Sequence, residues 1–341
     1  MDEIITVKDV AKRFKTYENS QGFLGSLRRK FYWKEALRGV SLSIERGSIV
    51  ALLGRNGSGK STLVKLMSGI IRPDSGSVRV MGMDPWSDRI KVTRRMGVVF
   101  GSTHPQLFWD LPPEDTFMYV KGLYGIPDRE YRQRLRYLVR ILTLEKVYRR
   151  QTRQLSLGER MKCEFAAALL NGPELVIMDE PTVGVDLPSR MAISDAVLDM
   201  RRRFDTTFVI TTHVVDDIAN TDRIVLLDNG RLLFDGTQAE LKRRFGRTAV
   251  LELFLRAGAE VSAYKGLGRV LSSRDGYIKL EIDPKSTGSA AFRSVFADKS
   301  VMDYRLSEPG LGSMLNSLYL SIDRKSRHGR GARPGARRSH G

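Results

Sequence analysis

The residues best suited to chemistry in this 341-residue sequence form one glycine-rich stretch, GRNGSGKS at residues 54–61. It matches the pattern G-x-x-x-x-G-K-[ST], in which backbone N–H groups surround phosphate oxygens and the lysine reaches the β and γ phosphates of a nucleotide. An apolar run at residues 48–53 precedes it and a helical pattern follows it, which is the context that the motif requires. The expected nucleotide contacts are Gly54, Asn56, Gly57, Ser58, Gly59, Lys60, Ser61 and Thr62. Ser61 is also expected to ligate Mg²⁺.

A pair of carboxylates, Asp179 and Glu180, follows the apolar run at residues 175–178. Sheets of α/β proteins bind ligands at the carboxyl ends of their strands, so this pair belongs beside the glycine-rich loop. Asp179 is expected to hold Mg²⁺, directly or through water, and Glu180 to act as general base on the attacking water. The alternative is that the two acids only cap a strand next to Pro181.

Elements that position these groups are visible as continuous apolar runs at residues 48–53, 175–178 and 208–210, with helical segments between them. Such runs are typical of strands buried on both faces, and they predict an α/β fold with a mainly parallel sheet. The sequence DNG at residues 228–230 lies between two apolar runs and predicts a hairpin. Strands are also predicted at residues 250–255, 277–282 and 301–306, in a small α+β appendage without a chemical motif.

The sequence LSLGE at residues 155–159 predicts a helix that begins with a capping box. Ser156 caps the helix and Glu159 reaches back to the backbone of Ser156. This helix N-terminus can have a structural role only. Alternatively, its backbone N–H groups also donate to a phosphate.

In this order and spacing, the motifs resemble the ATP-binding subunit of an ABC transporter over residues 1 to about 240. Residues 54–61 resemble Walker A, 176–179 Walker B, 155–159 the L-S-G-G-Q signature and 183–186 the D-loop. The resemblance implies a P-loop NTPase core with an antiparallel β-subdomain and a helical subdomain. It also implies that two subunits enclose two ATP molecules with Mg²⁺. The nucleotide site would then include Ser156, Gly158 and Asp186, and His213 would contact the γ phosphate.

Three features depart from that family pattern. Leu157 replaces the first signature glycine, and Glu159 replaces the glutamine. The loop after residues 96–100 lacks a glutamine at the expected place, and Gln106 is the candidate to substitute for it from a shifted position.

An aromatic residue that stacks on adenine is expected near residue 14; Phe14 fits the spacing, and Tyr17 is the alternative. The insertion at residues 22–27, the loop through 108–112 and the LSLGE sequence resemble the ABC-2-type export branch.

The predicted organisation has three parts: an ATPase domain at residues 1–245 with its helical subdomain at about 102–170, an accessory α+β domain at 246–320, and a disordered basic tail at 321–341. One cysteine, Cys163, excludes an internal disulfide and fits a reducing cytosol. We expect no signal peptide and no transmembrane segment. The resemblance to ABC transporter subunits further implies a cytoplasmic, peripheral location at the inner face of the cell membrane. It also implies a separately encoded permease as partner and a second ATPase subunit in a homodimer.

The charge of the chain offers a second function. Lys and Arg outnumber Asp and Glu by 57 to 39, for a net charge of +18, which attracts nucleic acid, anionic lipid or nucleotide. The mixture of cations and aromatic residues at 28–34 suits a lipid headgroup region as well as it suits RNA. A nucleic-acid-associated ABC-type ATPase is the alternative function, and two features disfavour it. Translation-type members carry two ATPase cassettes in one chain, whereas this sequence contains one Walker A motif. Repair-type members carry long coiled coils, whereas this sequence has no sustained heptad pattern. A nucleotide sensor without hydrolysis is disfavoured by the two acids at 179 and 180. We expect no nucleic-acid partner and an anionic membrane face instead.

Overall fold

The described part of the chain consists of most of its first 307 residues. The computed structural model describes residues 2–17, 31–101, 106–212, 220–245, 248–256, 258–283 and 297–307, together with 293, 295 and 314. The chain divides into two compact units, Met1–Thr237 and Gln238–Gly341. The division lies eight residues before the boundary expected at 245, because helix α7 (Gln238–Phe245) groups with the second unit.

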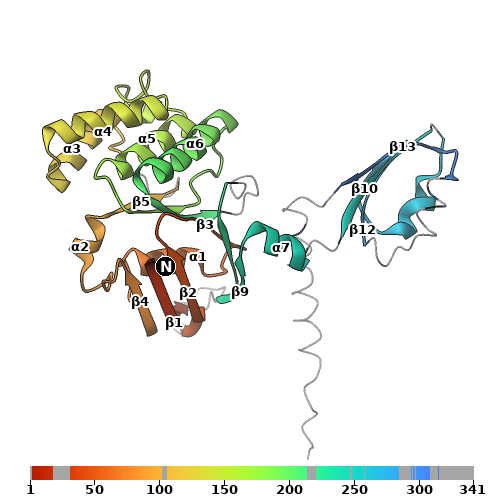
Figure 1. The fold of residues 1–341 in the computed structure, drawn as a ribbon, viewed down its shortest axis with the longest axis horizontal. Helices are drawn as coiled ribbons and strands as arrows, with labels where there is room; N and C mark the ends of the chain where they lie inside the picture. Colours follow the sequence, from red (N-terminus) through yellow and green to blue (C-terminus); the bar gives the residue numbers. More distant parts are fainter. Residues whose placement is uncertain are drawn as a thin grey trace, which may run out of the picture. The chain divides into compact units, whose positions relative to one another are not determined.

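A six-stranded sheet forms the centre of the first unit (Figure 1). Its strand order is β5-β6-β7-β3-β8-β9, parallel from β5 through β8, with β9 antiparallel to β8. The strands are β3 (Ile49–Gly54), β5 (Met96–Phe100), β6 (Leu175–Asp179), β7 (Thr207–Thr212), β8 (Arg223–Asp228) and β9 (Arg231–Gly236). The α/β class is confirmed, and so are the hairpin at Asp228–Gly230 and the three apolar strands.

Both faces of this sheet are covered, as the continuous apolar runs predict. Successive β6 residues alternate between two cores: Val176 packs with Phe165 and Phe208, whereas Ile177 packs with Leu63 and residues of the second sheet. The first core contains the helices α3 (Pro113–Tyr124), α4 (Asp128–Ile141), α5 (Leu157–Leu169) and α6 (Leu187–Phe204). These helices lie on one side of the sheet in Figure 1.

The opposite core joins the central sheet to helix α1 (Lys60–Met67) and to an antiparallel sheet of order β2-β1-β4. This sheet contains β1 (Glu3–Tyr17), β2 (Phe31–Glu45) and β4 (Ser75–Val80), and the short helix α2 (Arg89–Thr93) leads from it to β5. The antiparallel β-subdomain is therefore packed directly against the helix that begins at Lys60.

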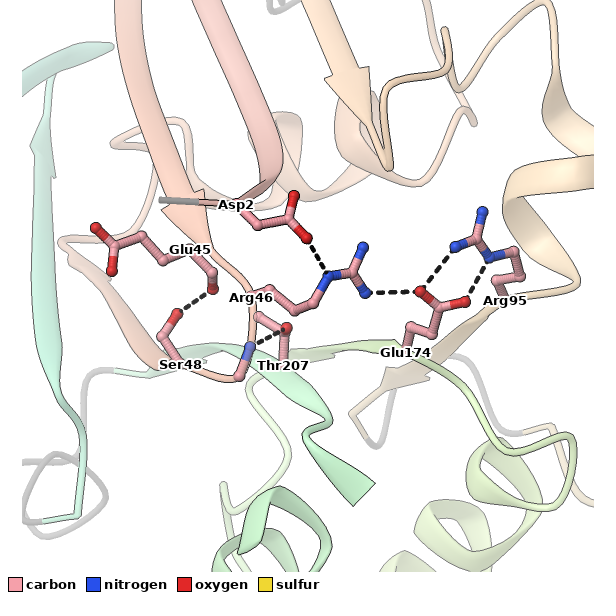
Figure 2. A network of polar contacts seen from close by, with 8 residues as sticks. Asp2, Glu45, Arg46, Ser48, Arg95, Glu174 and Thr207 are labelled. Carbon is pink, nitrogen blue, oxygen red and sulfur yellow. Dashed lines mark hydrogen bonds and ion pairs between the residues drawn. The ribbon is translucent and has the colours of Figure 1, made fainter. Parts of the chain in front are cut away.

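An ion-pair network lies at the amino ends of strands β5 and β6 of the central sheet (Figure 2). Glu174, just before β6, accepts hydrogen bonds from Arg95 at 2.5 and 2.7 Å and from Arg46 at 2.7 Å. Arg46 also donates to Asp2 at 2.8 Å. Ligands bind at the carboxyl ends of the strands in such sheets, and the network lies at the opposite, amino ends. We therefore assign it a role in stability alone.

The network makes stability depend on pH through Glu174. Hydrogen bonds from Arg95, and then from Arg46, hold the pKa of this carboxyl below its ordinary value. Its stabilising contribution is therefore present above about pH 4.3 and is lost as the pH falls through the lower folded pKa. We expect Glu174→Gln to lower the unfolding free energy at neutral pH by about 1 kcal/mol, since the pair is partly exposed. The unfolding free energies of the two proteins, measured with denaturant, should converge as the pH falls through the folded-state pKa of Glu174; a difference that does not change with pH would contradict this role.

The second unit contains the antiparallel sheet β11-β12-β10-β13 and a 3-10 helix at Val261–Leu267. Its strands are β10 (Ala249–Leu255), β11 (Arg269–Arg274), β12 (Tyr277–Ile282) and β13 (Val301–Ser307). Three of them occupy the predicted strand positions, and β11 was not predicted. Among the described helices of the chain, none combines the length and apolar character needed to cross a bilayer.

Candidate nucleotide-binding and catalytic site

The glycine-rich loop joins β3 to α1, as the motif predicts. Gly59 caps the helix with φ of 110°, and a Cβ at this position would lie 2.7 Å from the carbonyl oxygen of Ala36. Any larger residue would be strained and would collide with β2, so glycine is required here. Gly57, with φ of 79°, has open space around it, which leaves its backbone accessible to a ligand.

Lys60 lies inside this loop and is 5% exposed. Its Nζ donates to the carbonyl oxygens of Gly54 at 2.7 Å and Arg55 at 3.3 Å, and it lies 3.9 Å from Oε1 of Glu180. Burial lowers the pKa of the Lys60 ammonium, while the charges of Glu180 and Asp179 oppose that shift. A phosphate oxygen would replace the carbonyl contacts and compensate a cation that has little water around it.

The two carboxylates meet the loop at the end of β6. Oδ1 of Asp179 lies 3.4 Å from Oγ of Ser61, and it accepts a 2.6 Å hydrogen bond from Thr211. Adjacent ligands of an octahedral Mg²⁺ lie about 2.9 Å apart, so a small closure of this gap would let both oxygens hold the ion. Among the described residues there is no cluster of three or more His, Cys, Asp or Glu side chains able to hold a metal. One carboxylate and one hydroxyl, completed by phosphates and water, are a ligand set that fits magnesium.

Thr211, at the end of β7, is a site residue that the sequence analysis missed. Its Oγ1 accepts a 2.9 Å hydrogen bond from the backbone N–H of Glu180 while its own hydroxyl donates to Asp179. Glu180 has φ of 52°, a left-handed conformation that is uncommon outside glycine. Thr211 thus helps to hold both acids in place. The available signal was a polar residue at the carboxyl end of a buried strand.

A cavity of about 370 Å³ opens over the loop. It is large enough for part of a nucleotide. Its lining contains eight of the predicted site residues, namely Phe14, Asn56, Gly57, Gly59, Lys60, Ser61, Thr62 and Glu180, together with Lys34 and Ala36. Phe14, which is 40% exposed, pairs with Lys34 across β1 and β2. The side chain of the alternative, Tyr17, lies outside the described residues.

Gly54 and Ser58 are not in the cavity lining. Ser58 is buried behind the loop, and its hydroxyl has no hydrogen-bond partner among the described residues. The backbone N–H of Ser58 is already bonded to the carbonyl oxygen of Arg55 at 3.1 Å. A Cβ on Gly54 would lie 2.3 Å from Oγ of Ser58, so these two residues shape the loop from within.

Gln106 also lies away from the nucleotide cavity. Its Nε2 donates to the carbonyl oxygen of Val98 at 2.6 Å, and its backbone N–H donates to both carboxylate oxygens of Glu164, at 2.9 and 3.0 Å. The N–H of Leu107 donates to the same carboxylate at 3.2 Å. Gln106 therefore lines a different cavity, of about 230 Å³, next to α3. His213 and residues 102–105 lie outside the described residues.

Ser156, Gly158 and Asp186 form a second cluster, at the N-termini of α5 and α6. The capping box is confirmed: Glu159 N–H donates to Ser156 Oγ at 3.2 Å, and Ser156 N–H donates to the Glu159 carboxylate at 2.8 Å. Asp186 caps α6 by accepting from Ser189 N–H at 3.1 Å. None of these residues lines the cavity over Lys60 in the same chain.

The close contact of these two helix ends makes Gly158 sensitive to substitution. A Cβ there would lie 2.0 Å from Oδ1 of Asp186 and 2.4 Å from Oγ of Ser189. We expect Gly158→Ala to displace the Asp186 cap and to cost about 1–2 kcal/mol in unfolding free energy. The control is Gly122→Ala in α3, where a Cβ meets nothing within 4 Å and stability should be unchanged or slightly higher. Equal melting temperatures for the two variants would contradict the packing argument.

Comparisons with known proteins relate this chain to ATP-binding proteins of transporters. The family model described as ABC transporter matches residues 37–183. The doxorubicin resistance ATP-binding protein DrrA of Mycobacterium tuberculosis is 35% identical over 225 residues, covering 64% of this chain and 67% of that protein. The linearmycin resistance ATP-binding protein LnrL of Bacillus subtilis is 31% identical over 230 residues, covering 66% and 72%.

A solved structure, cbiO1 from Clostridium perfringens, part of the ABC transporter complex cbiONQ, superimposes with a TM-score of 0.57 at 26% identity. The superposition covers 72% of this chain and 95% of that one. The chain therefore belongs to the ABC transporter family, as one of its ATP-binding, ATP-hydrolysing subunits.

Proposed function

We propose that this subunit works as a homodimer at the inner face of the cell membrane and drives a separately encoded permease for export. The observation that carries the proposal is the division of the site within one chain. Lys60, Ser61 and Glu180 line the nucleotide cavity, whereas Ser156 and Gly158 lie at a helix end outside it. A second copy would bring its α5 N-terminus to the open side of the cavity and complete the site.

In this dimer the nucleotide phosphates lie over residues 54–61 and exchange the Lys60–carbonyl contacts for Lys60–phosphate contacts. Ser61 and Asp179 would hold Mg²⁺, which would neutralise charge on the β and γ phosphates. Thr211 fixes the Asp179 carboxylate and the backbone of Glu180. The Glu180 carboxylate then orients water toward the γ phosphate and accepts its proton. Phe14 borders the outer end of the cavity, where an adenine ring would stack.

Hydrolysis would open the dimer, because the γ phosphate that bridges the two subunits is cleaved and the products repel each other. His213 is part of this proposal as a γ-phosphate contact. Gln106 would reach the site only if its hydrogen bond to Val98 were broken.

The permease is proposed to contact the helical side of the unit. Large apolar side chains are exposed in this part of the chain: Phe108, Trp109, Leu111, Met118, Tyr119 and Leu123. Tyr119 and Leu123 also line the 230 Å³ cavity. Phe108 and Tyr119 pack edge to face at 5.4 Å, and aromatic clusters of this kind are frequent at interface hot spots. Export is supported by the relatives whose names refer to resistance against doxorubicin and linearmycin.

Ser156→Asp tests the shared site. Aspartate keeps the N-cap of α5, so stability should be unchanged, but its carboxylate would face the γ phosphate of the partner's nucleotide. We expect ATP binding to the monomer to remain and kcat to fall at least about 100-fold. The wild-type rate per subunit should also rise with protein concentration. A concentration-independent rate together with an active Ser156→Asp variant would contradict the dimer.

A further inference from the structure

The distal part of the β1–β2 ribbon extends beyond the rest of its sheet. Strand β4 pairs with β1 only as far as Ala11, opposite Ser75. From Arg13 onward β1 pairs with β2 alone, in the register Arg13–Glu35, Phe14–Lys34, Lys15–Trp33 and Thr16–Tyr32. The edge of β1 in this two-stranded segment is therefore not paired with β4.

The two faces carry different groups, because directly opposed residues share a face and neighbours along a strand alternate. Phe14 and Lys34 form one pair, and they line the nucleotide cavity. The opposite face, which we call the outer ribbon face, carries Arg13, Lys15, Phe31 and Trp33, with Glu35 at its inner end. A change on the outer ribbon face can thus be separated from the nucleotide site.

Cations cover the rings of the outer ribbon face. Arg13 Cζ lies 4.8 Å from the ring centroid of Trp33, and Lys15 Nζ lies 4.0 Å from that of Phe31. The two aromatic residues nevertheless remain 52% and 53% exposed. Glu35 is engaged by Arg38 at 3.2 Å, which reduces its effect on the neighbouring cations.

The charge of the surrounding sequence is strongly positive. Residues 12–34 contain seven Lys or Arg residues and one acidic residue, Glu18. Each cation near an anionic bilayer contributes about 1 kcal/mol of attraction. Exposed rings next to such cations form a surface that is apolar and cationic at once.

We propose that the outer ribbon face docks on an anionic lipid surface. Aromatic side chains settle at the boundary between headgroups and acyl chains, while Lys and Arg side chains extend to the phosphates. RNA would need open ring faces for stacking, and here Arg13 and Lys15 already occupy ring faces of Trp33 and Phe31. This inference rests on the proposed function in one respect, namely that a subunit driving a permease works beside the membrane. What is new is the surface of the subunit that contacts the lipid.

Vesicle sedimentation of the full chain tests the proposal. We expect binding to vesicles of phosphatidylcholine with phosphatidylglycerol, weakened by salt, and little binding to phosphatidylcholine alone. The double variant Phe31→Ser, Trp33→Ser should bind the anionic vesicles about tenfold more weakly. The matched control is Tyr32→Ser, which removes a 51% exposed ring from the other face and should bind like the wild type.

A fluorescence readout separates insertion of the ribbon from attraction of the basic tail, which all these variants retain. The chain has three tryptophans, so Trp86→Phe with Trp109→Phe leaves Trp33 as the reporter. Its emission should shift to shorter wavelength on anionic vesicles and stay unchanged on addition of an RNA oligonucleotide.

Several results would overturn the proposal: equal vesicle binding by the wild type and the double variant, an unshifted Trp33 emission, or RNA binding that is lost in the double variant while vesicle binding persists. ATP affinity is measured on the same proteins and should be unchanged. If the wild-type protein did not bind ATP, the result would count against the nucleotide site and would leave the lipid proposal untouched.

Discussion

Replacing Glu180 with glutamine is expected to abolish ATP turnover and to leave a stable ATP-bound dimer. Glutamine keeps the size of the side chain but cannot accept the proton of the attacking water. Lys60, Ser61 and Asp179 are untouched, so the phosphates and Mg²⁺ would still bind. Without hydrolysis the γ phosphate continues to bridge the two subunits. We expect a fall in kcat of at least about 1000-fold, with unchanged ATP affinity.

Size-exclusion chromatography with ATP and Mg²⁺ measures the trapped dimer. The matched control is Glu174→Gln, the same chemical change at the opposite edge of the central sheet, which should retain turnover. If the Glu180→Gln variant eluted only as a monomer, or retained turnover, the assignment of Glu180 as general base in a shared site would fail.

Lys60→Ala should act one step earlier, on nucleotide binding itself. The Lys60 ammonium is buried at the loop and close to both carboxylates, so a phosphate there loses its principal cationic partner when Lys60 is removed. A hydrogen bond to a charged group contributes about 1.5–3 kcal/mol, which predicts an ATP affinity roughly ten to a hundred times weaker.

Titration with a fluorescent ATP analogue gives this affinity directly. Lys65→Ala is the control, because Lys65 is an exposed cation on the same helix, and its removal changes the charge equally without reaching the cavity. An unchanged affinity in Lys60→Ala, or an equal loss in Lys65→Ala, would contradict the phosphate assignment.

The loop and the acid pair were predictable from the sequence because local order determines their placement. An apolar strand that ends in a glycine-rich turn leads residues 54–61 to the carboxyl edge of a parallel sheet, and Asp179 reaches the same edge by the same rule. The capping box of α5 was equally local, since Ser156 and Glu159 satisfy each other's backbone.

Site residues that are brought in by the pairing of strands far apart in the sequence were harder to predict. Thr211 enters the site because β7 lies between β3 and β6, an order that apolar periodicity does not reveal. Lys34 and Ala36 reach the cavity through the register of β1 and β2. Gln106 was predicted from loop spacing, but the buried Glu164 carboxylate binds the backbone there and directs the glutamine side chain to Val98.

A structure of the Glu180→Gln variant with ATP and Mg²⁺ would test the central claim most directly. We predict a symmetric pair in which each nucleotide contacts Lys60 and Ser61 of one subunit and Ser156 of the other. A nucleotide held by a single chain, with the α5 N-terminus of every neighbouring copy remote from its γ phosphate, would contradict the account.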